Sequence, residues 1–197
     1  MPDPLILVLS EEELEILKNT KFENPKLERT RDLFILQTYV LLRLSDFKEL
    51  GNYNYDIINK QIFKYQTKTG DSVTIPLPTT AIEILKKYDY QMPRISGQKY
   101  NENIKDMFKE LGYDNLIEEV SYSGNQKIVT RKPRYEFMSS HTARRTGITL
   151  LIKRGVPVNI IMKISGHRTI EALMSYIRIT KDEAAEVVRN AWEKKSS

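Results

Sequence analysis

Apolar residues recur at helical spacing through most of the chain. A capping-box pattern, Ser10 followed three positions later by Glu13, predicts a helix over residues 9–19. Pro25 suits the first turn of a second, longer helix, and the apolar positions that follow carry it to about Leu42.

A short helix follows, with Ser45 placed to cap its start and Gly51 placed to end it. The pattern becomes helical again after residue 78 and is helical throughout from His141 onward. These further helices are predicted over residues 79–88, 101–111, 141–153, 158–164, 169–177 and 181–192.

Between these helices the period shortens to that of β-strands. Residues 61–66 and 72–77 read as two strands around a turn that contains Gly70, and residues 55–58 suit a third strand. The segments EEVSYS and QKIVTR, around Gly124-Asn125, predict a second hairpin. The expected fold class is therefore mainly α with a small antiparallel β-sheet (α+β).

Length and composition suit one folded domain over residues 1–197. The chain has 40% hydrophobic and 29% charged residues, no cysteine, and no apolar run near 18 residues. Disulfides and zinc–thiolate sites are thereby excluded. We expect a cytoplasmic protein with no membrane segment.

The net charge is +5 and the pI about 9.2, which fits a polyanionic partner but equally a solvated basic surface. His141 and His167 are the only histidines, so histidine-based metal sites are nearly excluded. No metal-binding or nucleotide-binding motif occurs, and no cofactor is expected.

The stretch HTARR places basic groups on one side of a helix. His141 lies three residues from Arg144 and four from Arg145, so both arginines are its neighbours and spacing does not choose between them. An arginine fork and an imidazole suit a phosphate. The alternative is the ordinary basic start of a surface helix.

The stretch SGHRTIEALMSY places Tyr176 nine residues after His167. In one straight helix, at about 100° per residue, the two side chains would lie on opposite faces. Gly166 instead breaks the preceding helix and Thr169 can cap the next one, which leaves His167 in a turn. The alternative is a helix-capping histidine and a tyrosine packed in the core.

Two more cations stand out. Arg43 follows a long apolar helix and needs an anionic partner, for which Asp46 is the ordinary candidate. Lys68 lies at the tip of the first predicted hairpin, where a lysine is solvated or reaches into a groove.

In chain order these features resemble the catalytic domain of the tyrosine recombinases, the integrases of phages and mobile elements. The resemblance runs from LSEEELEIL to the end of the chain. The stretch from Ser139 to Thr180 is similar to the second conserved block of integrases from conjugative elements, KTGDSVTIPL to their β-hairpin, and LLRLSDFKEL to their first arginine block.

The resemblance implies an active site of Arg43, Lys68, His141, Arg144, His167 and a nucleophile, Tyr176. The tyrosine would form a 3′-phosphotyrosyl bond with DNA, and the two arginines would clamp the developing charge. His141 would accept the phenol proton or bind the phosphate. Lys68 would protonate the leaving oxygen, and His167 would donate to the phosphate. Neither a metal nor an energy cofactor is implied.

One position departs from the family pattern. A Thr-Gly-Leu-Arg turn is usual where this chain has Val40-Leu41-Leu42-Arg43. Without the glycine, the helix is expected to extend closer to Arg43, which affects where the arginine points.

The resemblance also implies partners: double-stranded DNA, on which copies of the chain assemble as a homo-oligomer, a tetramer. The core-binding and arm-binding domains that usually precede this domain are absent from residues 1–197. The terminal stretch KDEAAEVVRNAWEKK reads as an amphipathic helix that covers either its own core or a neighbouring copy.

Two alternatives remain. A type IB topoisomerase shares the chemistry, but the small size and the integrase-like helical block count against it. A non-catalytic DNA-binding regulator with the same fold is disfavoured by the presence of Tyr176, His141 and Arg144.

Overall fold

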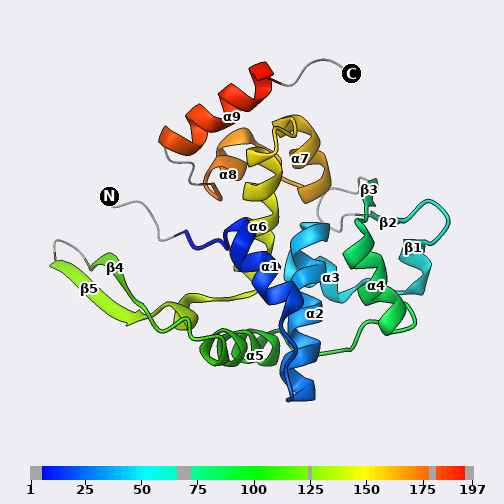
Figure 1. Cartoon of the computed structure of the whole chain (residues 1–197), viewed down its shortest axis with the longest axis horizontal. Coiled ribbons are helices and arrows are strands. Elements are labelled where there is room, and N and C mark those ends of the chain that lie inside the picture. Colours follow the sequence, from blue (N-terminus) through cyan, green and yellow to red (C-terminus); the bar gives the residue numbers. More distant parts are fainter. Residues whose placement is uncertain (1–5, 66–71, 124–125, 178–180, 194–197) are drawn as a thin grey trace.

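Helix α2 lies at the centre of the fold, with α1, α4, α5 and α6 packed around it (Figure 1). The computed structural model describes residues 6–65, 72–123, 126–177 and 181–193. These are mostly helical, with small antiparallel sheets, so the predicted fold class is confirmed. The helices are α1 (Glu11–Asn19), α2 (Pro25–Val40), α3 (Leu44–Lys48), α4 (Thr79–Lys87), α5 (Gly97–Glu110), α6 (Ser140–Lys153), α7 (Val158–Ser165), α8 (Ile170–Met174) and α9 (Lys181–Glu193), with 3₁₀ turns η1 (Asn52–Asn54) and η2 (Arg134–Phe137).

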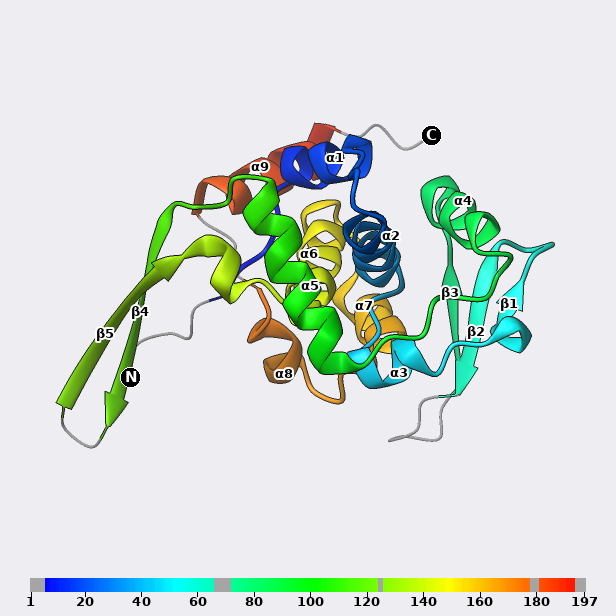
Figure 2. The ribbon, with the colours of Figure 1, turned by 90° about the horizontal axis from the view of Figure 1, so that it is seen from below.

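The strands form two separate antiparallel sheets. One has the order β1-β2-β3, and the other is the β4-β5 hairpin, which projects from the helical body (Figure 2). Both predicted hairpins and the third strand are confirmed. The strands are β1 (Tyr55–Asp56), β2 (Gln61–Tyr65), β3 (Ser72–Pro76), β4 (Leu116–Ser123) and β5 (Gln126–Pro133).

Several helix ends follow from local hydrogen bonds. The predicted capping box of α1 forms, with the Ser10 hydroxyl accepting from the Glu13 amide at 3.1 Å. The predicted Ser45 cap is wrong: Arg43 is the N-cap residue of α3, with no side-chain cap bond. Helix α5 begins four residues before the predicted Asn101, because the Ser96 hydroxyl accepts from the Lys99 amide at 3.2 Å.

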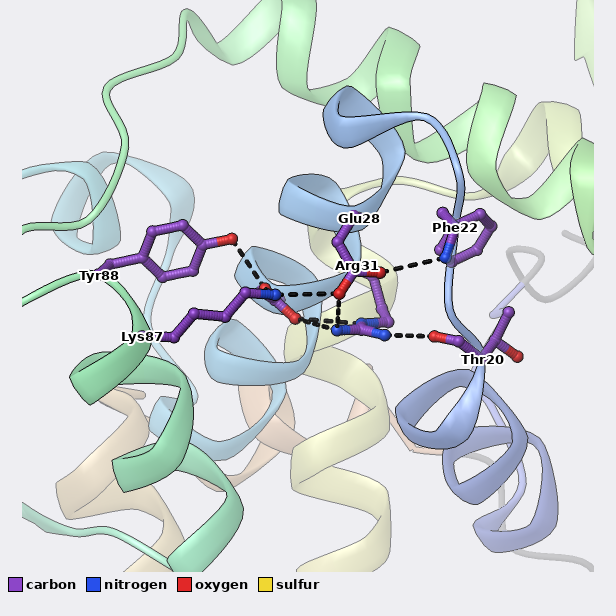
Figure 3. A network of polar contacts seen from close by, with 7 residues as sticks. Thr20, Phe22, Glu28, Arg31, Lys87 and Tyr88 are labelled. Carbon is purple, nitrogen blue, oxygen red and sulfur yellow. Dashed lines mark hydrogen bonds and ion pairs between the residues drawn. The ribbon is translucent and has the colours of Figure 1, made fainter.

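A network of polar contacts ties α4 and the α1–α2 connection to α2 (Figure 3). Asp32 accepts from Arg31, from Lys87 Nζ at 2.7 Å and from Tyr88 Oη at 2.7 Å. Burial and this bond to Asp32 raise the pKa of Tyr88. Glu28 accepts from the same Lys87 at 2.9 Å. Arg31 also donates to the Thr20 carbonyl, and the Phe22 amide donates to Glu28, so the network fixes α4 and the α1–α2 connection on the N-terminal half of α2.

Helix α6 packs closely against α2 because Gly147 has no side chain. A Cβ added at Gly147 would lie 2.0 Å from the Thr38 carbonyl oxygen and 2.5 Å from Leu41 Cδ2. This close approach brings the middle of α6, with Arg144, beside the C-terminal end of α2, where the candidate site lies.

The C-terminal helix α9 contacts α6 of its own chain. Its Val188 and Trp192 side chains are nonetheless largely exposed, at 56% and 85%. The amphipathic helix is confirmed, and its packing on a neighbouring copy stays a prediction. Within the described residues, no helix is both long enough and apolar enough to cross a membrane.

Candidate active site

The turn after α2 creates one wall of the site. Helix α2 ends at Val40, and Leu41 takes the left-handed conformation with φ 56° and ψ 17°. A non-glycine residue pays about 1–2 kcal/mol for this conformation, which the burial of the Leu41 side chain offsets. The expected extension of the helix toward Arg43 is therefore wrong, since leucine adopts the turn that glycine usually makes.

Arg144 is the buried cation of the site, with 1% of its surface exposed. Its Nη1 donates to the Leu41 carbonyl at 2.6 Å and its Nη2 to the Ser165 carbonyl at 2.8 Å. Among the described residues, no carboxylate lies within 4 Å of this guanidinium, and its Nε has no partner. Burial, and then the charge of Arg43, lower its pKa to about 10. A buried cation without a counter-ion is a strong site for an anion.

His167 lies beside Arg144 and is also buried. Gly166 ends α7 with φ 70°, and the Thr169 hydroxyl caps α8 by accepting from the Ala172 amide. The predicted turn is therefore confirmed. His167 Nε2 lies 3.3 Å from Arg144 Nη2, and Nδ1 lies 2.7 Å from Ser165 Oγ. Burial, then the charges of Arg144 and Arg43, lower the pKa of His167 to about 4.

Tyr176 lies directly on this cluster. Helix α8 ends at Met174, earlier than predicted, so Tyr176 is in the turn that follows. Its ring centroid is 4.9 Å from that of His167, in an edge-to-face arrangement. The guanidinium carbons of Arg144 and Arg145 lie 5.7 and 5.3 Å from the ring centroid. Tyr176 therefore packs against His167 and the guanidiniums of Arg144 and Arg145.

The two adjacent arginines of HTARR have different surroundings. Arg144 is fixed by two carbonyls and His167, whereas Arg145 is half-buried and contacts the face of Tyr176. The structure thus separates the two residues that spacing left equivalent: Arg144 points into the cluster, and Arg145 covers the tyrosine.

Arg43 adds to the positive field of the site, and His141 lies within that field. Arg43 is half-buried at the start of α3, and none of the ion pairs between described residues joins it to Asp46. His141, near the start of α6, stays accessible. Its pKa is lowered by partial removal from water, then by Arg145, Arg144 and Arg43. The surrounding cations therefore favour the neutral form of this imidazole.

The predicted Lys68 lies outside the described residues. The strands on either side of it are described, and β3 borders a groove against α7. Ser72, at the start of β3, lines this groove together with Gly166 and His167.

Acidification is expected to weaken the fold through His167. Unfolded, this side chain takes up a proton near its ordinary pKa of 6.5, whereas the folded form resists protonation until about pH 4. Because the unfolded state then binds more protons, the free energy of unfolding falls as pH falls from 6.5 to 4, by on the order of 3 kcal/mol. Denaturant titrations of wild type and His167→Gln across this pH range measure the free energy of unfolding. An equal pH dependence in both proteins would contradict the role of His167.

The model of the phage integrase family matches residues 8–183. This covers most of the chain, including the Arg43 turn, the HTARR helix and Tyr176.

The chain belongs to the phage integrase family.

Curated relatives in this family are tyrosine recombinases. The chain is 25% identical over 172 residues to tyrosine recombinase XerA of Saccharolobus solfataricus, covering 86% of this chain and 53% of the relative. It is 25% identical over 182 residues to a tyrosine recombinase of Thermosipho africanus, covering 92% and 60%. The chain thus spans little more than half the length of these relatives.

Solved structures share the fold of this integrase-family chain. A crystal structure of XerA recombinase matches with a TM-score of 0.69 at 15% identity, covering 98% of this chain and 68% of that one. The Tn1549 transposon integrase in complex with circular intermediate DNA matches with a TM-score of 0.60 at 16% identity, covering 98% and 66%. At this identity the similarity establishes the fold alone.

Two features of this integrase-family site were missed from the sequence. Ser165 contacts His167 through its hydroxyl and Arg144 through its carbonyl. No periodic or motif signal marks a serine at the end of a helix. The contact of Arg145 with the Tyr176 ring could not be predicted either, although spacing had placed Arg145 beside His141.

Proposed function

We propose that the chain is the catalytic domain of a site-specific recombinase that cuts and rejoins double-stranded DNA through Tyr176. The observation that carries this proposal is the packing of a tyrosine ring against His167 and two guanidiniums, one of them buried without a carboxylate partner among the described residues. A phosphodiester supplies the anion that such a pocket lacks.

The proposed step is an in-line displacement at phosphorus. The Tyr176 phenol oxygen bonds to the scissile phosphorus as the bond to the 5′-oxygen breaks, which leaves a 3′-phosphotyrosyl enzyme and a free 5′-hydroxyl. Charge gathers on the non-bridging oxygens, where the guanidiniums of Arg43 and Arg144 stabilise it. Because one phosphoester replaces another, attack by a 5′-hydroxyl reverses the step without an energy source.

Two protons must move during this step. A neutral His141, as its lowered pKa favours, takes the phenol proton. Lys68 donates a proton to the departing 5′-oxygen. Ser72, which lies four residues after Lys68 in the sequence, lines the same groove as His167.

The proposed partners are DNA and further copies of the chain. The basic net charge of +5 supports a polyanionic substrate. Exchange between two duplexes cuts four strands, and each Tyr176 can hold one strand end. A tetramer on DNA is therefore the assembly that complete exchange requires. We further propose that this domain acts within an integrase of a mobile element.

Arg144→Lys is expected to reduce covalent DNA attachment by at least about 10²-fold. A lysine keeps the charge but cannot donate to the Leu41 and Ser165 carbonyls while presenting a fork to phosphate. The assay uses a pool of short nicked duplexes of random sequence, in which cleavage near the nick releases a fragment too short to remain paired. Denaturant-stable protein–DNA adducts are then counted by gel electrophoresis.

The neighbouring substitution Arg145→Lys is the matched comparison. It keeps a cation over the Tyr176 ring and is expected to lower the adduct yield by less than about tenfold. Equal losses in the two variants would mean that Arg144 has no special role at the phosphate. Unchanged yield in Arg144→Lys would reject the proposed clamp.

A further inference from the structure

Ser165 lies where it can decide which nitrogen of His167 carries the proton. The residue is buried at the end of α7, with 2% of its surface exposed. Its Oγ lies 2.6 Å from the Ile161 carbonyl oxygen and 2.7 Å from His167 Nδ1. A carbonyl only accepts, so the single hydroxyl proton points to Ile161. The same oxygen must then accept a hydrogen bond from Nδ1–H.

The opposite side of the ring leads to the same assignment. His167 Nε2 lies 3.3 Å from Arg144 Nη2, and a guanidinium nitrogen only donates. Nε2 therefore presents its lone pair, and a proton there would face the Arg144 cation. Both contacts require the neutral ring with its hydrogen on Nδ1.

We propose that Ser165 is a positioning residue that holds His167 in the Nδ1–H tautomer, with Nε2 kept free of hydrogen and directed at the phosphate-binding side of Arg144. The charged and titratable groups nearest the ring are Arg144 on α6, Arg43 at the start of α3 and Tyr176 after α8. Lys163 and Arg168 line the groove that His167 borders. None of them contacts Nδ1 as a hydrogen-bond acceptor among the described residues. Ser165 is thus the group that anchors this side of the ring.

This arrangement has a consequence for the proposed reaction, and that consequence rests on the proposed function. A phosphate oxygen in front of Nε2 accepts hydrogen bonds but cannot donate one. The ring must then take up a proton from solvent at Nε2 in order to donate to the phosphate. Ser165 continues to accept from Nδ1–H, so the imidazole becomes charged without turning. DNA binding would in this way favour a protonation of His167 that burial and the two arginines otherwise oppose.

The tautomer is measured directly by ¹⁵N NMR of the imidazole nitrogens, at pH 7 and without DNA. The chain has two histidines, so two ring systems appear, and the His141→Gln variant assigns them. We expect His167 to show a protonated Nδ1 and a bare Nε2. A hydrogen bond of this kind is worth about 1.4 kcal/mol, or roughly a tenfold preference for one tautomer. An Nε2–H signature in wild type would overturn the proposal.

Ser165→Ala removes the hydroxyl and is expected to reduce that preference roughly tenfold, which gives a mixed or averaged signature. Thr38→Val is the matched control, because the buried Thr38 hydroxyl also donates to the carbonyl four residues earlier, at 2.9 Å, without touching His167. The control should keep the wild-type signature. An unchanged signature in Ser165→Ala would show that the serine does not position the ring. Since no DNA is present, neither result depends on whether the chain cleaves DNA.

Discussion

Tyr176→Phe is expected to abolish covalent DNA attachment, with a loss of at least about 10³-fold, while the protein still binds DNA. The substitution removes one oxygen and keeps the ring, so the contacts with His167 and with both guanidiniums remain possible. The phenol oxygen is the proposed nucleophile, and a phenylalanine ring has no atom that can attack phosphorus in its place. Thermal unfolding should be nearly unchanged, which separates loss of chemistry from loss of fold.

The adduct assay and a salt-dependent DNA-binding assay check this expectation together. Binding of a basic domain to DNA weakens as salt rises, in the variant as in wild type. Retained binding with no adduct supports the nucleophile. An adduct of wild-type yield in Tyr176→Phe would assign the chemistry to another residue. Absence of an adduct in both proteins would favour the non-catalytic regulator.

Gly147→Ala is expected to destabilise the fold by about 3 kcal/mol or more, the largest single effect on stability that we predict. The new Cβ would meet the Thr38 carbonyl oxygen at 2.0 Å and Leu41 Cδ2 at 2.5 Å. Backbone cannot move aside as a side chain can, so α6 must shift away from α2. That shift also displaces the Leu41 carbonyl from Arg144, and DNA attachment should fall even where the protein stays folded.

Gly112→Ala serves as the control for this substitution. Gly112 has φ +76°, and an added Cβ finds nothing within 4 Å, so only the conformational cost of about 1 kcal/mol remains. Chemical denaturation of the two variants measures the difference. Similar losses of stability would show that the α2–α6 contact tolerates a methyl group, against the packing described above.

Periodicity and capping rules predicted most of the secondary structure, because the helices are amphipathic and several begin at residues with strong capping preferences. The helix ends near the site were harder to predict. Leucine favours helix, yet Leu41 ends α2, since its side chain is buried and its carbonyl accepts from Arg144, more than a hundred residues later. Local propensity contains no information about such a distant partner.

The sequence could predict which residues form the candidate site, but not how their side chains contact one another. Chain order identified Arg144, His167 and Tyr176, and the structure brings all three into contact. Their roles stay proposals. Ser165 could not be found in this way, because a tautomer depends on two contacts from different elements, and neither has a sequence signature.

The central claim is tested most directly by mapping the covalent bond. Wild-type protein trapped on the nicked duplexes is digested, and mass spectrometry identifies the residue that carries the nucleotide and the end of the strand to which it is attached. We expect a 3′-phosphate linked to Tyr176. Attachment at another residue, or through a 5′-phosphate, would contradict it.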